Sequence, residues 1–271
     1  NVSEINYVDT DGVDSFASQG GTLTSIDVDA NTTPVYSVDG GTVNGTTITK
    51  VGDYGTLTLD SSTGVYTYEP NDSVIDALSE STSESFTLRV SDDNPNGLST
   101  VDTKTLTVNI TAVNDSPLLG GNSNSVTFTE NGSKVLIDST ITISDQEGES
   151  YDGGYLFIKN LTNGENADQL VVTEIGGITL SGSDVLYAGT VIGSIDSTYN
   201  GVDGKDLKIN FNTDAYSVQV QALAQAIAFD NATNDINSDA RTYQIQVNDG
   251  GEPTPRFSTK DITVNIDAIN D

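Results

Sequence analysis

Polar and apolar residues alternate along most of this chain. In residues 55–59, Leu57 and Leu59 alternate with threonines, and in residues 65–68 Val65 and two tyrosines follow a polar turn. Alternation with a period of two is typical of a strand with one buried face. The two segments and the turn at 60–64 therefore predict a β-hairpin.

The same alternation recurs between clusters of Gly, Asn, Asp and Ser, at intervals of roughly 8–12 residues. This rhythm is typical of an all-β sandwich. The first half is predicted to contain strands at residues 23–28, 55–59, 65–69, 85–91 and 104–111. The second half is predicted to contain strands at residues 125–129, 140–144, 155–161, 170–174, 189–195, 207–211, 242–248 and 261–266.

Two segments depart from the strand pattern. Residues 73–78 predict a single helical turn that bridges the sheets. Residues 217–229 predict a short amphipathic helix on one sheet edge, because apolar residues recur there near helical spacing. The predicted apolar stripe, which we assign to the core, consists of Val218, Leu223, Ala226, Ile227 and Phe229.

One phrase occurs twice. Residues 108–115, VNITAVND, return as residues 264–271, VNIDAIND, with six of eight positions identical at an offset of 156. Each copy is an alternating strand followed by Asn-Asp, first Asn114-Asp115 and then Asn270-Asp271. The repeat predicts two tandem modules cut from a longer array. Pro117 cannot continue a central strand, so we place the domains at 1–115 and 116–271.

The charge excludes several partners. The chain has 40 Asp and Glu against 10 Lys and Arg, a formal net charge of -30. Such a chain has no basic patch for nucleic acid or for an anionic membrane. Self-repulsion on this scale destabilises a compact state unless cations relieve it. The carboxylates can serve as a solubilising surface in salty water or as Ca²⁺ ligands, and the composition leaves both readings open.

Missing residue types narrow the chemistry further. The chain has no Cys, His, Met or Trp. Disulfides, thiolate nucleophiles, imidazole bases and zinc sites of the His/Cys type are therefore excluded. The lack of a starting Met indicates a fragment, expected to be monomeric. No apolar run approaches the roughly 20 residues needed to cross a bilayer, so no membrane insertion is expected.

Acidic and amide side chains gather where predicted strands end. Because Ca²⁺ takes six to eight oxygens, ligands from several loops must converge. We expect the linker, a carboxylate after a strand, a strand-end Asp-x-Glu pair and an Asn-Asp-Gly turn to form one Ca²⁺ site where the modules meet. The candidate ligands for that site are Asn114, Asp115, Glu130, Asp145, Glu147 and Asp249. Further candidates are Asp27, Asp29 and Asp92 in the first module and Asn270 and Asp271 at the end of the sequence.

Two weaker acidic motifs accompany these candidates. Asp9-Thr10-Asp11 has the same spacing of two carboxylates. Residues 200–206 have the Asn, Asp and Gly density of a calcium loop but lack the EF-hand spacing, so an ordinary tight turn is the favoured reading.

These motifs carry a resemblance to a family. Residues 112–117, AVNDSP, resemble the Ca²⁺-binding linker between cadherin domains, and Glu130, Asp145, Glu147 and Asp249 resemble its other ligand motifs in order. Residues 55–115 look like the VCBS-type bacterial cadherin-like repeat, and residues 217–271 look like another cadherin-like repeat. Ala112 departs from the family, which usually places an acid there, and the linker is one residue shorter before the proline.

The resemblance implies two cadherin-like, Ig-like β-sandwich domains. The second domain carries the short helix and is longer than a minimal repeat, with an insertion near residues 163–205 that could carry a ligand site. The resemblance also implies Ca²⁺-rigidified extender modules of an RTX-type adhesin, secreted by a type I system to the bacterial cell surface. Such an adhesin would support cell adhesion or biofilm formation, and the expected partners are adjacent repeats of the same chain and a cell-surface glycan or protein.

The sequence offers two other functional classes besides a spacer. A carbohydrate- or protein-binding module is the alternative, because Tyr151, Tyr155, Tyr187 and Tyr199 are expected to be exposed, although the lack of Trp counts against it. Paired carboxylates could hydrolyse glycosides. We do not expect an enzyme, because the sequence has no nucleophile motif and the acids are better explained as ligands.

Overall fold

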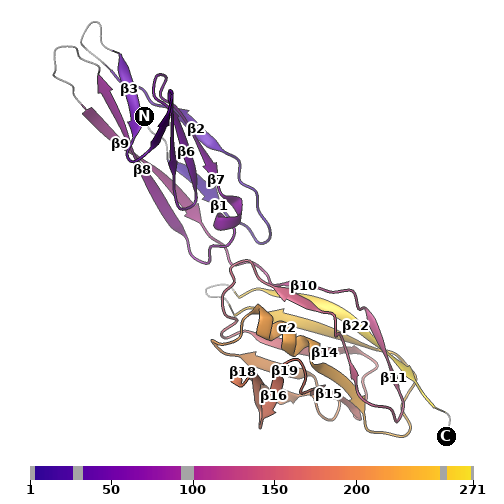
Figure 1. Ribbon diagram of the computed structural model, residues 1–271. Coiled ribbons are helices and arrows are strands. Elements are labelled where there is room, and N and C mark those ends of the chain that lie inside the picture. The colour runs from indigo at the N-terminus through magenta and orange to yellow at the C-terminus, as the bar shows by residue number, and fades with distance from the viewer. Residues whose placement is uncertain (1–3, 27–32, 93–100, 251–254, 270–271) are drawn as a thin grey trace. The chain divides into compact units, whose positions relative to one another are not determined.

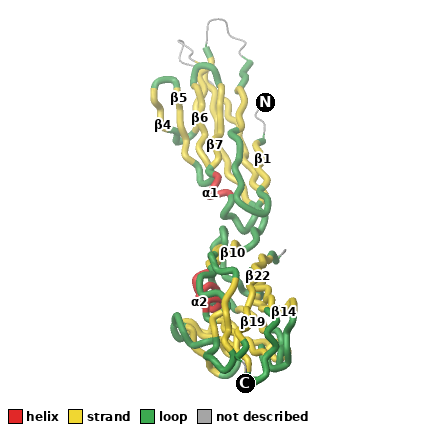
Figure 2. Tube along the Cα trace, turned by 90° about the vertical axis from the view of Figure 1, so that its right-hand side faces the viewer, coloured by secondary structure: helices red, strands yellow, loops and turns green. Residues whose placement is uncertain are grey.

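The computed structural model describes residues 4–26, 33–92, 101–250 and 255–269. These residues form two compact units, Asn1–Val113 and Asn114–Asp271. Strands dominate both units, and the two helices are short (Figure 2). The all-β fold class predicted from the alternation is confirmed.

Unit 1 is a sandwich of two sheets (Figure 1). Its strands are β1 (Ile5–Val8), β2 (Gln19–Thr22), β3 (Pro34–Val38), β4 (Thr42–Asn44), β5 (Thr47–Val51), β6 (Gly55–Asp60), β7 (Val65–Pro70), β8 (Thr82–Asp92) and β9 (Val101–Thr111), and its helix is α1 (Asp72–Ile75). One sheet has the order β1-β9-β8-β3 and the other the order β2-β7-β6-β5-β4. Alternate residues of both sheets meet in one core, which contains Leu57, Tyr68, Leu88 and Leu106.

The predicted hairpin is β6 and β7. Leu57, Leu59, Tyr66 and Tyr68 are buried. Oδ1 of Asp60 accepts hydrogen bonds from the main-chain N–H groups of Ser62 and Thr63, which closes the turn. The alternating pattern located this hairpin because one of its faces is buried and the other is not.

The strand predicted at residues 23–28 is wrong over residues 23–26, which form no strand, and residues 27 and 28 lie outside the described part. The strand on the other side of β7 from β6 is instead β2. Its sequence, Gln-Gly-Gly-Thr, has no apolar pattern, so periodicity could not detect it. Glycine is needed there, because a Cβ on Gly20 would lie 2.2 Å from the carbonyl oxygen of Tyr66.

Unit 2 is larger and contains one broad sheet. Its strands are β10 (Leu118–Gly120), β11 (Ser125–Thr129), β12 (Val135–Leu136), β13 (Thr142–Ser144), β14 (Tyr155–Thr162), β15 (Asp168–Val172), β16 (Ile178–Ser181), β17 (Asp184–Tyr187), β18 (Thr190–Asn200), β19 (Leu207–Phe211), β20 (Ile227–Asn231), β21 (Arg241–Asn248) and β22 (Phe257–Asp267), and its helix is α2 (Ser217–Gln225). The broad sheet has the order β11-β22-β21-β14-β19-β18-β17-β16. The sheets β12-β20-β15 and β10-β13 complete the unit, and the core between them contains Phe128, Leu156, Phe229 and Ile245.

The helix predicted at residues 217–229 is partly wrong. Helix α2 ends at Gln225, and Ile227 and Phe229 belong to β20, which pairs with both β12 and β15. Val218 is 65% exposed, so it is not part of the core. Val220, Leu223 and Ala224 form the buried side of the helix instead. The run of apolar residues contained a helix and a buried strand, and their joint spacing imitated one longer helix.

A buried charged network fixes one end of unit 2. The Arg241 side chain is fully buried and pairs with Glu165 at 2.8 Å and Asp168 at 3.3 Å. Asp168 also accepts a 2.7 Å hydrogen bond from the Asn231 side chain. The network joins the start of β21 to β15 and β20, so the smaller sheet is held to the broad one by paired charges as well as by apolar packing.

Candidate metal centres

In unit 1, three carboxylates lie together. One oxygen from each of Asp9, Asp14 and Asp76 lies within 4.8 Å of the other two. Asp9 follows β1, Asp14 lies in the loop before β2, and Asp76 caps the C-terminus of α1. Asp9 and Asp76 are 1% and 3% exposed. Carboxylate oxygens this close and this buried suit a hard divalent cation such as Ca²⁺.

Main-chain hydrogen bonds connect this group to the end of unit 1. The Asp9 N–H donates to the Thr111 carbonyl at 3.0 Å, and the Val113 N–H donates to Oδ2 of Asp9 at 3.3 Å. The Asp14 N–H donates to Oδ1 of Asp76 at 2.9 Å. The group therefore holds the last residue of unit 1.

Sequence reasoning found only part of this group. Asp9 belonged to a noted Asp-x-Asp pair, but its partner Asp11 is not in the group, and Asp14 and Asp76 were missed. Asp76 follows a four-residue helix, and nothing in its local sequence distinguishes it from the other acids.

In unit 2, a second group surrounds a small cavity of about 10 Å³. Its lining includes Asn114, Asp145, Glu147, Glu149 and Asp249. A cavity of this size has room for about one water-sized particle. The structure thus brings together four of the six ligands expected at the linker, and it adds Glu149, which the sequence analysis did not single out.

Asp115 lies directly beside this group and organises it. The Asp115 N–H donates to Oε1 of Glu147 at 2.7 Å, and Oδ2 of Asp115 accepts from the Gln146 side chain at 2.9 Å. Asn114 donates from Nδ2 to Oδ2 of Asp249 at 2.9 Å. The first two residues of unit 2 therefore hold two of its acids in position.

The electrostatics of this group favour a bound cation. Burial, reinforced by the Asp145 carboxyl, raises the pKa of Glu147 to about 7. Burial also raises the pKa of Asp145, and the nearby charges of Asp249 and Asp115 act in the same direction. Oε2 of Glu147 is buried and accepts no hydrogen bond from the residues described. A cation would relieve the repulsion and provide the missing partner, so the residues present fit Ca²⁺.

Glu130 does not join this group, so its predicted place beside Asp115 is wrong. Its N–H donates to the Asp267 carbonyl, and its Oε2 accepts from the Ile269 N–H at 2.7 Å. Asp249 lies at the other end of β22, where its N–H donates to the Arg256 carbonyl. Eleven residues of extended strand separate the two ends by roughly 35 Å.

The position of Glu130 repeats that of Asp9. Strand β1 runs parallel to β9, and strand β11 runs parallel to β22. Asp9 follows β1 and binds the Val113 N–H, while Glu130 follows β11 and binds the Ile269 N–H, and Val113 and Ile269 are 156 residues apart. In each unit, an acid that follows the first strand of a parallel pair therefore accepts a hydrogen bond from the N–H of the residue before the Asn-Asp pair.

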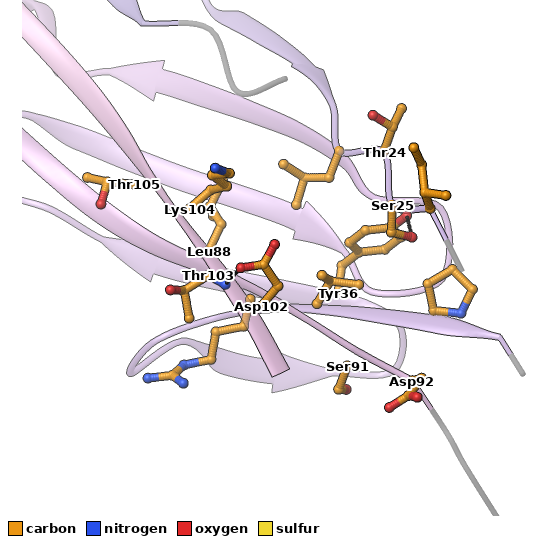
Figure 3. Close-up of a pocket in the computed structure, with 15 residues that line it drawn as sticks. Thr24, Ser25, Tyr36, Leu88, Ser91, Asp92, Asp102, Thr103, Lys104 and Thr105 are labelled. Atoms are coloured by element: carbon orange, nitrogen blue, oxygen red, sulfur yellow. Dashed lines mark hydrogen bonds between the residues drawn. The ribbon is translucent and has the colours of Figure 1, made fainter. Parts of the chain in front are cut away.

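The remaining candidates lie elsewhere. Asp92 is the last residue of β8 and corresponds to Asp249 in unit 2. Ser91 pairs with Val101, and Asn248 pairs with Phe257, which lies 156 residues after Val101, so the residues that follow Ser91 and Asn248 are equivalent. Asp92 lines a cavity of about 670 Å³ in unit 1, in which the hydroxyls of Ser25 and Tyr36 are 3.1 Å apart (Figure 3). Asp27, Asp29, Asn270 and Asp271 lie outside the described residues.

The tyrosines expected to be exposed fall into two groups. Tyr151 is 1% exposed and lines the small cavity of the second group, so its predicted exposure is wrong. Tyr187 packs against the core. Tyr155 is half-buried and Tyr199 is 42% exposed.

No protein-family profile matches the chain, and no curated protein matches it. Solved structures with detectable similarity include human CDH23 EC21-23, at 14% identity and a TM-score of 0.35, and mouse cadherin-23 EC22-24, at 13% and 0.32. PcdhgB3 EC1-4 is similar at 14% and 0.36. These matches cover 96%, 98% and 99% of this chain and 72%, 63% and 48% of the other chains, so the chain spans less than two thirds of two of the three.

The two helices within the described residues are too short to cross a bilayer.

Proposed function

We propose that this chain forms two calcium-binding spacer modules of a bacterial cell-surface adhesin, related to the cadherin-like repeats of RTX-type proteins. The modules are extracellular and not enzymatic. Their partners are adjacent repeats of the same chain, and the whole adhesin supports cell adhesion or biofilm formation. The cadherin-like motifs of the linker and the acidic composition support this proposal.

One observation carries the proposal. The first carboxylate group binds Val113, and the second includes Asn114, the next residue in the sequence. Ca²⁺ at both groups would restrain the main chain on each side of one peptide bond. A linker held in this way transmits force between modules without a flexible hinge.

Calcium would also add stability. An ion that binds the folded chain and not the unfolded chain raises the free energy of unfolding by mass action. The gain has an electrostatic source here, because the bound charge offsets repulsion within each group. Affinities of about 10⁻⁴–10⁻³ M are usual for extracellular Ca²⁺ modules, and we expect values in that range.

Calorimetric titration of the whole chain with Ca²⁺ tests this function. Asp76→Asn is expected to remove binding at the first group and Asp249→Asn binding at the second, while Asp184→Asn, an exposed acid on β17, serves as the matched control. Thermal unfolding with and without chelator should show a rise in Tm of many degrees with Ca²⁺ in the wild type. An unchanged Tm in excess chelator would rule out the proposal.

The restraint on the linker has a separate test. Amide hydrogen exchange at residues 112–115 should slow when Ca²⁺ is added, and the effect should be lost in the variant that combines Asp76→Asn with Asp249→Asn. If calcium binds but exchange at these amides does not change, the chain is a calcium-binding protein and not a calcium-stiffened spacer.

A further inference from the structure

The outer face of the broad sheet in unit 2 carries a group of aromatic rings. Leu156 and Ile158 of β14 are fully buried, so Tyr155 and Phe157, which alternate with them, lie on the opposite face. The ring centroids of Tyr155 and Phe157 are 6.3 Å apart, and those of Phe157 and Tyr199 are 5.1 Å apart. Three neighbouring rings on the solvent side of a sheet offer more apolar surface than a scattered exposed residue does.

Two cations lie against these rings. Nζ of Lys208 is 4.1 Å from the centroid of the Tyr155 ring, and Nζ of Lys159 is 4.9 Å from that of Phe157. The chain has only ten Lys and Arg residues, so two beside adjacent rings form a local concentration of positive charge. Acids share the area. Asp196 interacts with Lys208 and has a lowered pKa, chiefly because it accepts hydrogen bonds from the N–H groups of Tyr199 and Thr198. Asp261 accepts a hydrogen bond from Gln244, the residue opposite Lys159.

Side-chain amides complete this face. Gln246 lies opposite Phe157 on β21, and Asn210 lies opposite Tyr155 on β19. Gln246 accepts a hydrogen bond from Lys159, and Asn210 donates one to Asp196. Amides offer both donors and acceptors, which is what hydroxyl groups of a bound ligand require.

We propose that this face, made of Tyr155, Phe157, Tyr199, Lys159 and Lys208, binds a polysaccharide that contains uronic acids. The apolar faces of pyranose rings would pack on the aromatic rings beside the lysines, the lysines would pair with the carboxylates, and Asn210 would bond to hydroxyl groups. Gln246 is only 5% exposed, so its part is to hold Lys159 in place. None of its side chains is a proposed Ca²⁺ ligand, but Tyr155 faces Asn248, the residue before Asp249, so one edge of the face lies near the second carboxylate group.

Charge decides between anionic sugars and other ligands. The net charge of -30 repels polyanions at long range, but salt screens that repulsion beyond about 8 Å at 0.15 M ionic strength. At contact, Lys159 and Lys208 supply positive charge beside the rings, and Asp196 beside Tyr199 is an acid that an anionic ligand must avoid. A uronate polymer also brings apolar ring faces, which match the aromatic part of the face.

Calorimetry with short oligogalacturonates and hyaluronate oligosaccharides in 0.15 M salt tests the proposal, with a neutral dextran oligosaccharide for comparison. The wild type should bind the uronate sugars and not the dextran. Tyr199→Ala, Phe157→Ala and Lys208→Gln should each weaken binding about tenfold or more. Tyr216→Ala, an exposed tyrosine before α2, and Lys134→Gln, an exposed lysine outside this face, should leave it unchanged.

Several outcomes would overturn the proposal. The proposal fails if the wild type binds neither uronate sugar or binds dextran equally well. It also fails if the two control variants lose as much affinity for the uronate sugars as the variants in the face. Self-association of the chain that Phe157→Ala abolishes, without any sugar binding, would assign the face to a second copy of the protein instead. Tyr199 is largely exposed, so Tyr199→Ala should fold, and its Tm separates lost binding from lost structure.

The calcium proposal can fail independently. The Asp76→Asn variant should keep the affinity of the wild type for uronate sugars, because Asp76 belongs to unit 1 and the aromatic face is built by unit 2. Loss of sugar binding in that variant would contradict the independence of the two sites.

Discussion

The main-chain N–H of Asp115 donates a 2.7 Å hydrogen bond to Oε1 of Glu147, whose pKa is raised to about 7. This bond joins the first residues of unit 2 to the acid whose other oxygen, Oε2, is buried and accepts no bond within the described part of the chain. The protonation of Glu147 is therefore linked both to stability and to metal binding.

Without Ca²⁺, unit 2 should lose stability as the pH rises. The pKa of Glu147 is raised from 4.5 to about 7, so its protonated form favours folding. This contribution is complete below pH about 4.5 and is lost as the pH rises through about 7. Ca²⁺ should reverse the trend above pH 7, because it replaces the proton.

Thermal unfolding in chelator between pH 4 and pH 8 measures this dependence. Glu147→Gln should flatten the part of the pH profile between 4.5 and 7 and should weaken Ca²⁺ binding at the same time. An identical profile for the wild type and Glu147→Gln would show that Glu147 does not titrate in this range.

Glu130 should stabilise the end of unit 2. Its two oxygens accept from the N–H groups of Ile236 and Ile269 while it is 3% exposed. Glu130→Ala leaves two donors without a partner, so the free energy of unfolding should fall by about 1–3 kcal/mol. Glu130→Gln retains one acceptor oxygen, so its free energy of unfolding should fall by less. Urea denaturation of both variants measures the difference, and equal losses would show that the acceptor oxygens are not the cause.

Arg241 should be among the most sensitive positions in unit 2. Arg241→Met leaves the buried Asp168 without its cation, and breaking a buried pair in this way costs about 3–5 kcal/mol. The matched control is Arg89→Met, which breaks a surface pair with Asp39 where both side chains are more than 40% exposed. We expect little change in that control, because solvent screens such pairs. Similar losses in the two variants by chemical denaturation would contradict this assignment.

Phe229 tests the correction of the helix prediction. Its buried ring packs at 5.2 Å from Phe128 and 6.0 Å from Tyr243, so Phe229→Ala should lower the free energy of unfolding by about 3–5 kcal/mol. Phe257→Ala removes a ring that is 55% exposed and should cost far less. A small effect of Phe229→Ala in urea denaturation would mean that β20 is not in the core.

The alternating pattern determined a large part of the fold by itself. It located the β6–β7 hairpin and the all-β class, because a strand with one buried face leaves a period of two in the sequence. It could not detect β2, whose Gly20 and Gly21 lack a pattern, nor separate α2 from β20, where a helix and a fully buried strand are joined in one apolar run.

The residue types determined what the candidate sites can bind, because carboxylates without imidazole or thiolate suit a hard cation. Local spacing also grouped Asp145 with Glu147, since nearby residues stay near each other in any fold. Only the tertiary structure decided that Asp14 and Asp76 join Asp9 and that Glu130 lies away from Asp115. Those distances depend on which strands pair: the parallel pairing of β1 with β9 and of β11 with β22 places each acid at the end of its unit, and a pairing between distant segments leaves no mark in the local sequence.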